Sequence, residues 1–279
     1  MRLPFDAHNH VHMGPSSPLM ALQSAVDGTT ILSGMAIMST HPKDYARINH
    51  LTDSLPEKVP GTHIVPCYGV HPWFLHELTE RDWEPSSSSG LPQFAQELDA
   101  LIVATPNAIV GEIGLDRARY DPHTLDLPTS MEKQLTAFEI QMKIAAHRQR
   151  PVSIHCVQSW GSMMQVLSRL KKKSRLPPTI YFHAFGGKVG TVDQLLAICG
   201  RDCTFFGFAP VINFRSPKTA NVIRYIGLDR LVLETDHEDA SRVPESVENG
   251  IRLLANALDE SEDTIVERTT ANALTLYNL

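Results

Sequence analysis

The chain of 279 residues is poor in cysteine, and its four cysteines include no C-x-x-C pair of the kind that binds metals or carries out redox reactions. Sparse, unpaired cysteines are typical of reduced intracellular proteins rather than of secreted domains held by disulfides. No apolar run approaches the roughly 18 residues that a membrane-spanning helix needs. Histidines that could carry function occur by residue 8, where the apolar region of a secretion signal would lie. We therefore expect a protein of the cytoplasm or nucleus with no membrane partner.

The chain also lacks an excess of positive charge, because 31 acidic residues against 25 lysines and arginines give a formal net charge of −6. This excludes a surface coated in positive charge for non-specific nucleic-acid binding, although a local basic groove remains compatible with it. No G-x-G-x-x-G or phosphate-binding loop motif follows an apolar segment, which disfavours a doubly wound open sheet. The length suits either two ordinary domains or one α/β barrel of about 250 residues.

What the sequence does contain is a series of eight short apolar or β-rich segments, most of them followed by a helical pattern. The segments are 3–8, 29–38, 62–69, 108–114, 152–155, 179–183, 203–211 and 230–234. Helices are expected over 130–149, 161–171, 192–199 and 245–258, with a final helix that begins after Ser261 and ends near Leu279. Repeated strand–helix alternation with apolar strands predicts an α/β fold, a (β/α)₈ TIM-type barrel that occupies residues 1–279 as one domain.

Polar residues end many of these segments. His8 and His10 lie two residues apart, so in an extended strand their side chains point to the same face. The later positions are His71 after the third segment, Glu112 in the fourth, His155 in the fifth, His183 in the sixth and Asp236 after the eighth. In a barrel of parallel strands these positions share the C-terminal rim, where catalytic groups collect.

Four histidines and two carboxylates are the right type and number of ligands for two divalent metal ions. We expect one ion to be bound by His8, His10 and Asp236 and the other by His155 and His183, with Glu112 as the bridge. Zinc, manganese and magnesium all remain open as the native metal. Two such ions can activate a water molecule and stabilise the leaving oxygen of an in-line displacement. Asp236 is also placed to accept the proton of that water, so Glu112 and Asp236 are the predicted catalytic carboxylates.

Each residue also has a simpler interpretation. Taken singly, His155 and His183 are typical of hydrogen-bonded core histidines, and Asp236 could cap a following helix. A common position on one rim favours metal binding instead. His71 before a proline could shape a turn, and Arg119 could be a surface residue.

Six motifs taken together resemble the TatD-type metal-dependent deoxyribonucleases, which belong to the amidohydrolase-like barrels. The motifs are Asp-Ala-His-Asn-His at 6–10, Gly-Val-His-Pro at 69–72, Gly-Glu-Ile-Gly-Leu-Asp at 111–116, Ile-His at 154–155, His-Ala-Phe-Gly-Gly at 183–187 and Leu-Glu-Thr-Asp at 233–236. The resemblance implies a hydrolase of DNA phosphodiester bonds, often a 3′–5′ exonuclease, and a divergent eukaryotic, for instance fungal, member. It also implies that His71 and Arg119 contact the substrate phosphate, a role for which Arg117 competes with Arg119. We expect a monomer, with an oligomer left open.

Three departures from the family pattern lie around the expected substrate rim. Val157 stands where a basic residue is common, Gly186 replaces the usual serine, and 237–239 (His-Glu-Asp) replaces a segment with proline. The six predicted metal ligands are unchanged. Two alternatives therefore stay open, namely a metal-dependent hydrolase of a small substrate that is not nucleic acid, and a catalytically weak barrel kept as a binding protein. Glu112 argues against the first, because the barrels that hydrolyse small substrates usually carry a bridging lysine on the fourth strand.

Overall fold

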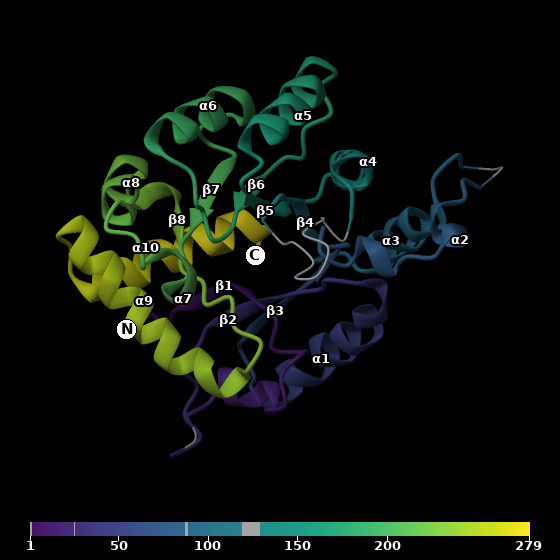
Figure 1. Ribbon diagram of the computed structural model, residues 1–279. Coiled ribbons are helices and arrows are strands. Elements are labelled where there is room, and N and C mark those ends of the chain that lie inside the picture. The colour runs from purple at the N-terminus through teal and green to yellow at the C-terminus, as the bar shows by residue number, and fades with distance from the viewer. Residues whose placement is uncertain (1, 25, 87–88, 119–128) are drawn as a thin grey trace.

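The computed structural model describes residues 2–24, 26–86, 89–118 and 129–279. In these residues eight parallel strands form one sheet in which each strand pairs with the next along the chain (Figure 1). The strands are β1 (Phe5–Asn9), β2 (Gly34–Met38), β3 (His63–Tyr68), β4 (Ile109–Asp116), β5 (Val152–Val157), β6 (Ile180–Phe182), β7 (Thr204–Gly207) and β8 (Leu231–Val232). The segment after β8 returns to β1, because the Ala7 amide donates to the Leu233 carbonyl at 2.8 Å. The sheet thus curls into the predicted barrel.

Helices follow most of the strands and cover the outside of the sheet (Figure 1). They are α1 (Tyr45–Lys58), α2 (Glu80–Trp83), α3 (Gln93–Ala104), α4 (Met131–Arg148), α5 (Trp160–Lys172), α6 (Val189–Cys199), α7 (Pro210–Asn213), α8 (Thr219–Ile226), α9 (Val243–Leu258) and α10 (Glu262–Tyr277). The expected helices match α4, α5, α6, α9 and α10 to within a few residues at each end. The segment 203–211 is shorter as a strand than expected, because Pro210 starts α7, and proline favours the first turn of a helix.

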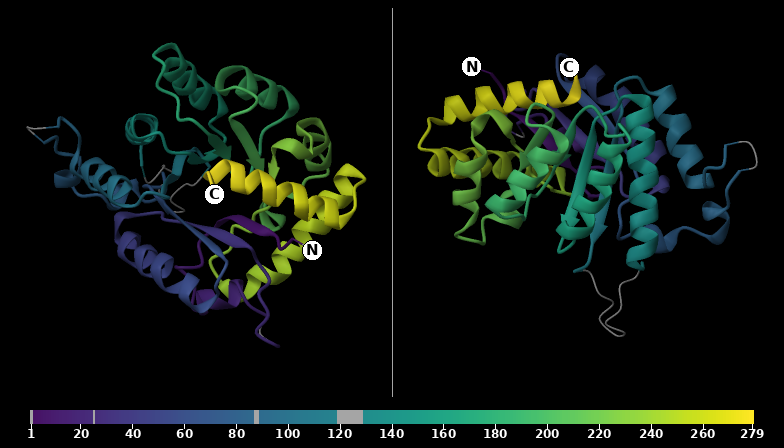
Figure 2. Two further views of the ribbon diagram at one scale, coloured as in Figure 1. Left: turned by 180° about the vertical axis from the view of Figure 1, so that it is seen from behind. Right: turned by 90° about the horizontal axis from the view of Figure 1, so that it is seen from above.

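The last helix, α10, lies along one end of the barrel (Figure 2). Its residues Ala273, Leu276 and Tyr277 pack in one apolar cluster with residues of the strands, among them Phe5. The Tyr277 hydroxyl donates to the Ala7 carbonyl at 2.6 Å. This packing closes the amino-terminal mouth of the barrel and leaves the carboxyl-terminal rim open for a site.

Alternation along the strands decides which side chains reach that rim. On β5, Val152, Ile154 and Cys156 pack into the large apolar cluster shared with the helices. The residues between them, Ser153 and His155, therefore face the barrel interior. Among the described residues no helix is both long and apolar enough to cross a membrane.

Candidate metal centre

The six predicted ligands meet at the carboxyl-terminal rim, although they are separated by up to 228 residues in the sequence. They come from β1 and the residue after it (His8, His10), from β4 (Glu112), from β5 (His155), from the residue after β6 (His183) and from the loop after β8 (Asp236). Glu112 and the histidines are buried, and the side chain of Asp236 is 17% exposed.

Glu112 is the centre of the arrangement, because its two carboxylate oxygens face different imidazoles. Its Oε2 atom lies 3.1 Å from His10 Nε2 and 3.5 Å from His8 Nε2. Its Oε1 atom lies 2.6 Å from His183 Nε2 and 3.2 Å from His155 Nδ1. The carboxylate therefore stands between two pairs of nitrogens, as the predicted bridge requires.

Asp236 joins only one of these two pairs. Its Oδ1 atom lies 3.5 Å from His8 Nε2 and 3.6 Å from His10 Nε2. Asp236 has a φ of 58°, a left-handed backbone conformation that non-glycine residues adopt uncommonly and that recurs at functional positions. His8, His10 and Asp236 thus lie together near one oxygen of Glu112, and His155 and His183 lie near the other; that each group binds one ion stays a prediction.

The outward nitrogens of His8, His10 and His155 are held by the protein, whereas His183 Nδ1 is buried without a hydrogen-bond partner among the described residues. His10 Nδ1 donates to the Met38 carbonyl at 2.9 Å, and His8 Nδ1 lies 3.2 Å from the Ser153 hydroxyl. His155 Nε2 lies 2.9 Å from Asp116 Oδ2. A proton held on the outward nitrogen leaves the inward nitrogen with its lone pair, which is the form of histidine that binds metals.

The inward nitrogens face one another in pairs. His8 Nε2 and His10 Nε2 are 3.3 Å apart, as are His155 Nδ1 and His183 Nε2. Two lone pairs at this distance repel unless a proton or a cation lies between them. The donor set of imidazole nitrogens and carboxylate oxygens therefore fits divalent cations such as zinc or manganese.

The electrostatics of the site point the same way. Burial raises the pKa of Asp236, and burial together with the charge of Asp236 raises the pKa of Glu234 well above its usual range. Burial also favours neutral Glu112, but the nearby imidazoles of His183, His71 and His8 and a hydrogen bond from His10 hold its pKa well below the usual range. Burial opposes a charge on His10, yet the hydrogen bond and charge of Glu112 raise the pKa of His10 to about 9. Buried carboxylates in such proximity call for positive charge.

His71 differs from the other histidines of the site. Its Nε2 atom lies 3.3 Å from Glu112 Oε1, while its Nδ1 atom accepts a hydrogen bond from the Trp73 amide at 3.1 Å. Burial lowers the pKa of His71 to about 4, so the ring is neutral and its proton sits on Nε2. His71 therefore presents a hydrogen-bond donor to the site, as a contact to substrate would require. Arg119 lies outside the described residues, and Arg117 is exposed directly after β4.

Two further acidic side chains, for which the sequence predicted no role, form hydrogen bonds to a predicted ligand or to residues beside one. Asp116, at the end of β4, holds His155 and also accepts from Trp73 Nε1 at 2.8 Å. Glu234 accepts from the Ala184 amide at 2.7 Å and bonds the Tyr181 hydroxyl. Both residues belong to motifs named above, but the motifs alone do not show what the two carboxyl groups contact in the fold.

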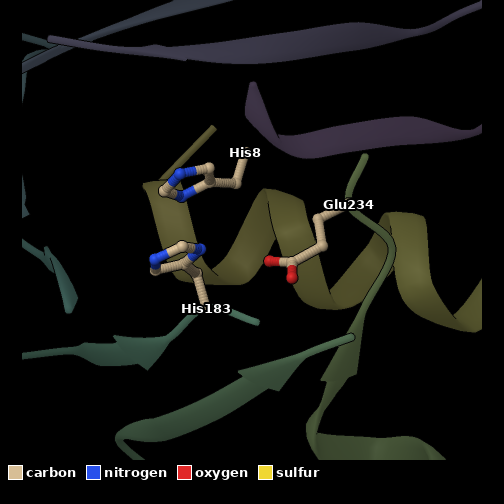
Figure 3. A group of neighbouring side chains, drawn as sticks. All are labelled: His8, His183 and Glu234. Atoms are coloured by element: carbon tan, nitrogen blue, oxygen red, sulfur yellow. The ribbon is translucent and has the colours of Figure 1, made fainter. Parts of the chain in front are cut away.

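Glu234 lies beside a pair of stacked imidazoles (Figure 3). The rings of His8 and His183 are 3.8 Å apart between centroids and nearly parallel at 6°. One ligand atom of each of these histidines and of Glu234 lies within 4.8 Å of the others. The Glu234 carboxyl group points toward the His183 ring.

A cavity of about 470 Å³ opens above the centre. Its wall includes five of the six predicted ligands and His71, and it is also lined by Trp73, Phe74, Ile212 and Glu238. The volume lies within the range of small-molecule sites. The site can therefore admit a substrate group to the ligands while aromatic side chains exclude part of the surrounding water.

Comparison with known proteins extends over the whole chain. The family model described as TatD related DNase matches residues 5–278. Cut9-interacting protein scn1 of Schizosaccharomyces pombe is 24% identical over 330 residues, which cover 94% of this chain and 95% of that protein. The 3′-5′ ssDNA/RNA exonuclease TatD of Edwardsiella piscicida is 30% identical over 205 residues, which cover 74% of this chain and 68% of that protein. The crystal structure of the TatD homolog YjjV from Escherichia coli shares the fold, with a TM-score of 0.74, 22% identity and coverage of 99% of this chain and 98% of that one.

Proposed function

This chain belongs to the TatD family of related DNases, and from that premise we propose that it is a divalent-metal-dependent hydrolase that cleaves phosphodiester bonds of DNA. Cleavage proceeds from a strand end, as in an exonuclease, and the working unit is a monomer. The four free cysteines support a cytoplasmic or nuclear place of action.

The position of Glu112 is the observation that carries this proposal. One carboxylate whose two oxygens face separate pairs of imidazole nitrogens is the arrangement that a bridging ligand needs. His8, His10 and Asp236 would hold one divalent cation, and His155 and His183 the other. When bound, such cations neutralise charge on a phosphate and lower the pKa of a water molecule.

The remaining work falls to residues of the chain. His71 Nε2 donates a hydrogen bond to a phosphate oxygen, because the Trp73 amide occupies the other ring nitrogen. Asp236 accepts the proton that the attacking water loses, since it lies at the cavity wall and burial raises its pKa toward that of a useful base. Trp73 and Phe74 restrict access of bulk water to the reacting groups.

The test compares the wild-type chain with two variants that lose a proposed ligand. Protein stripped by a chelator is supplied with Zn²⁺, Mn²⁺ or Mg²⁺ and given end-labelled single-stranded and duplex DNA. We expect stepwise release of nucleotides by the wild-type chain and its loss in Glu112→Ala and Asp236→Ala. Asp99→Ala, on α3 and paired with Arg148 at the surface, is the matched control and keeps the activity. Cleavage without metal, or undiminished cleavage by Glu112→Ala, would contradict the proposal.

A hydrolase of a small uncharged substrate is the second candidate, and Glu238 is the observation that favours it. This carboxylate lines the cavity and would repel a polyanion that approached from its side. Metal-dependent hydrolysis of small esters or amides by a chain that leaves DNA intact would favour this candidate.

A further inference from the structure

A second cavity, of about 830 Å³, opens on the same rim beside the metal centre. Its wall comes from the segments that follow β5, β6 and β7, namely 156–160, 184–190 and 208–222 in part. Ile212 on α7 lines both cavities, so the two cavities adjoin at this side chain. A ligand held at the metal centre can therefore extend over Ile212 into the second cavity.

The wall of this cavity is largely apolar and partly aromatic. Trp160 is half-buried there, and its ring packs at 5.0 Å between centroids from the buried ring of Phe185. Ile212 is 50% exposed, which is high for a large apolar side chain. Trp160 and Ile212 thus both offer apolar surface to a ligand in this cavity. Nucleobases stack on aromatic side chains without regard to base identity.

Charge at the cavity mouth favours the same ligand. Lys188 and Lys218 line the cavity with exposed side chains, and neither forms an ion pair with any described residue. Glu238 lies on the wall of the metal cavity instead. A polyanion is therefore attracted to the lysine side of the centre and repelled from the Glu238 side.

We propose that the second cavity binds the nucleobase of the nucleotide next to the phosphodiester bond that is cleaved, with Ile212 between base and metal centre and with Lys188 and Lys218 near the following phosphates. This inference rests on the proposed function. Val157 and Gly186, two of the departures from the family pattern, both line the cavity. The shape of its wall is thus partly set at two positions where this sequence departs from the motifs of the resemblance.

Glycines provide a way to fill the cavity without disturbing the fold. A Cβ atom built at Gly186 meets nothing within 4 Å, so Gly186→Leu would project into the cavity. Gly161 on α5 has equally open surroundings and lines neither cavity, so Gly161→Leu is the matched control. Both variants are first compared with the wild-type chain by thermal unfolding. Gly190→Leu, also open and on the cavity wall, replaces Gly186→Leu if that variant fails to fold.

The kinetic test uses single-stranded oligonucleotides with an ordinary base or an abasic unit at the terminal position. With the wild-type chain we expect KM to rise roughly fivefold to 100-fold for the abasic substrate, the range of base–aromatic stacking. Gly186→Leu should show the same rise for the ordinary substrate and no further rise for the abasic one. Gly161→Leu should behave as the wild-type chain. Equal KM values for both substrates, with Gly186→Leu unchanged, overturn the inference while leaving the proposed function intact.

A binding test without catalysis separates the two failures. Trp160 fluorescence is followed as deoxyadenosine monophosphate is added to chelator-treated protein, with Trp160→Phe to identify the signal of this residue. We expect saturable quenching that Gly186→Leu abolishes and Gly161→Leu retains. If the wild-type chain cleaves no nucleic acid, the proposed function fails, and this titration alone decides whether a nucleotide base binds. Absence of quenching then overturns the inference as well.

Discussion

Asp116→Asn tests whether the centre depends on carboxylates that do not themselves face the cations. Asp116 accepts hydrogen bonds from His155 Nε2 at 2.9 Å, Trp73 Nε1 at 2.8 Å and the Ala118 amide at 2.6 Å. The side chain is 2% exposed, so water does not replace a lost partner. An asparagine offers one acceptor oxygen, and its amide group opposes the donors on the other side. His155 then loses the partner that fixes its proton on the outward nitrogen.

The size of the effect follows from these contacts. Loss of a partner that orients a metal-binding histidine typically lowers metal affinity about 10- to 100-fold. Although burial opposes its charge, the hydrogen bond and charge of His155 lower the pKa of Asp116 to about 2. A shift from 3.8 to about 2 corresponds to roughly 2 kcal/mol at 1.36 kcal/mol per unit. We therefore expect the metal-free variant to lose about 2 kcal/mol of unfolding free energy at neutral pH.

The measurements are Zn²⁺ affinity by competition with a chelator and unfolding in urea of metal-free protein. Asp99→Asn is the control, because Asp99 accepts from Arg148 Nε and Nη2 at 2.7 Å each but lies on α3, away from the rim. That surface pair should contribute about 1 kcal/mol or less and leave Zn²⁺ affinity unchanged. If Asp116→Asn binds Zn²⁺ as tightly as the wild-type chain, Asp116 does not orient a metal ligand.

Three further predictions address the centre and its surroundings. Metal added to the stripped wild-type chain at 100-fold excess over Kd should stabilise the fold by about 2.7 kcal/mol, seen in calorimetry as a higher thermal unfolding midpoint. Glu112→Gln should abolish most of this rise. An equal rise in the variant and the wild-type chain would exclude Glu112 as a ligand. Gly207→Ala should lower the unfolding free energy, measured in urea, by about 1–3 kcal/mol, because a methyl group there would clash with the carboxyl group of Glu234. A variant as stable as the wild-type chain would show that the surrounding side chains move aside without cost. Although burial opposes the charge of Asp44, hydrogen bonds from His12 and from backbone amides hold the pKa of this carboxyl well below its usual range. Asp44→Asn should therefore lower the unfolding free energy by about 1–3 kcal/mol at pH 7. Since the folded pKa is depressed, that difference should shrink as the pH falls below about 4, and a difference in urea that stays constant down to pH 3 would argue against the ionised form.

Much of the fold and the positions of the ligands could be predicted because both depend on short-range pattern. The spacing of His8 and His10 puts them on one face of a strand, and the position of His155 at the end of an apolar segment puts it on the rim. The shape of the loops could not be predicted in this way. The second cavity is formed by three segments after β5, β6 and β7 that contact one another only in the folded barrel. No local periodicity encodes that contact.

The supporting carboxylates show the same limit within one motif. Glu234, Thr235 and Asp236 are consecutive, yet each meets a different part of the barrel. The Glu234 carboxyl group lies next to His8 and His183. The Thr235 hydroxyl donates to Asp6 Oδ2 at 2.7 Å, across the junction between the segment after β8 and β1. Asp236 reaches His8 and His10, and its backbone adopts the left-handed conformation in the loop after β8.

The contacts of Thr235 and Asp236 fasten the segment after β8 to β1 and the residue that follows it, at the point where the barrel closes. Asp6 is fully buried and also accepts from the Thr235 amide at 3.0 Å and from Asn9 Nδ2 at 3.0 Å. Burial raises the pKa of Asp6 to about 7 despite these bonds. The residues that join the two ends of the sheet are therefore neighbours of predicted metal ligands. A substitution at Asp6 or Thr235 should alter the unfolding free energy and the metal affinity together. Such coupling follows from the closed topology rather than from any single motif.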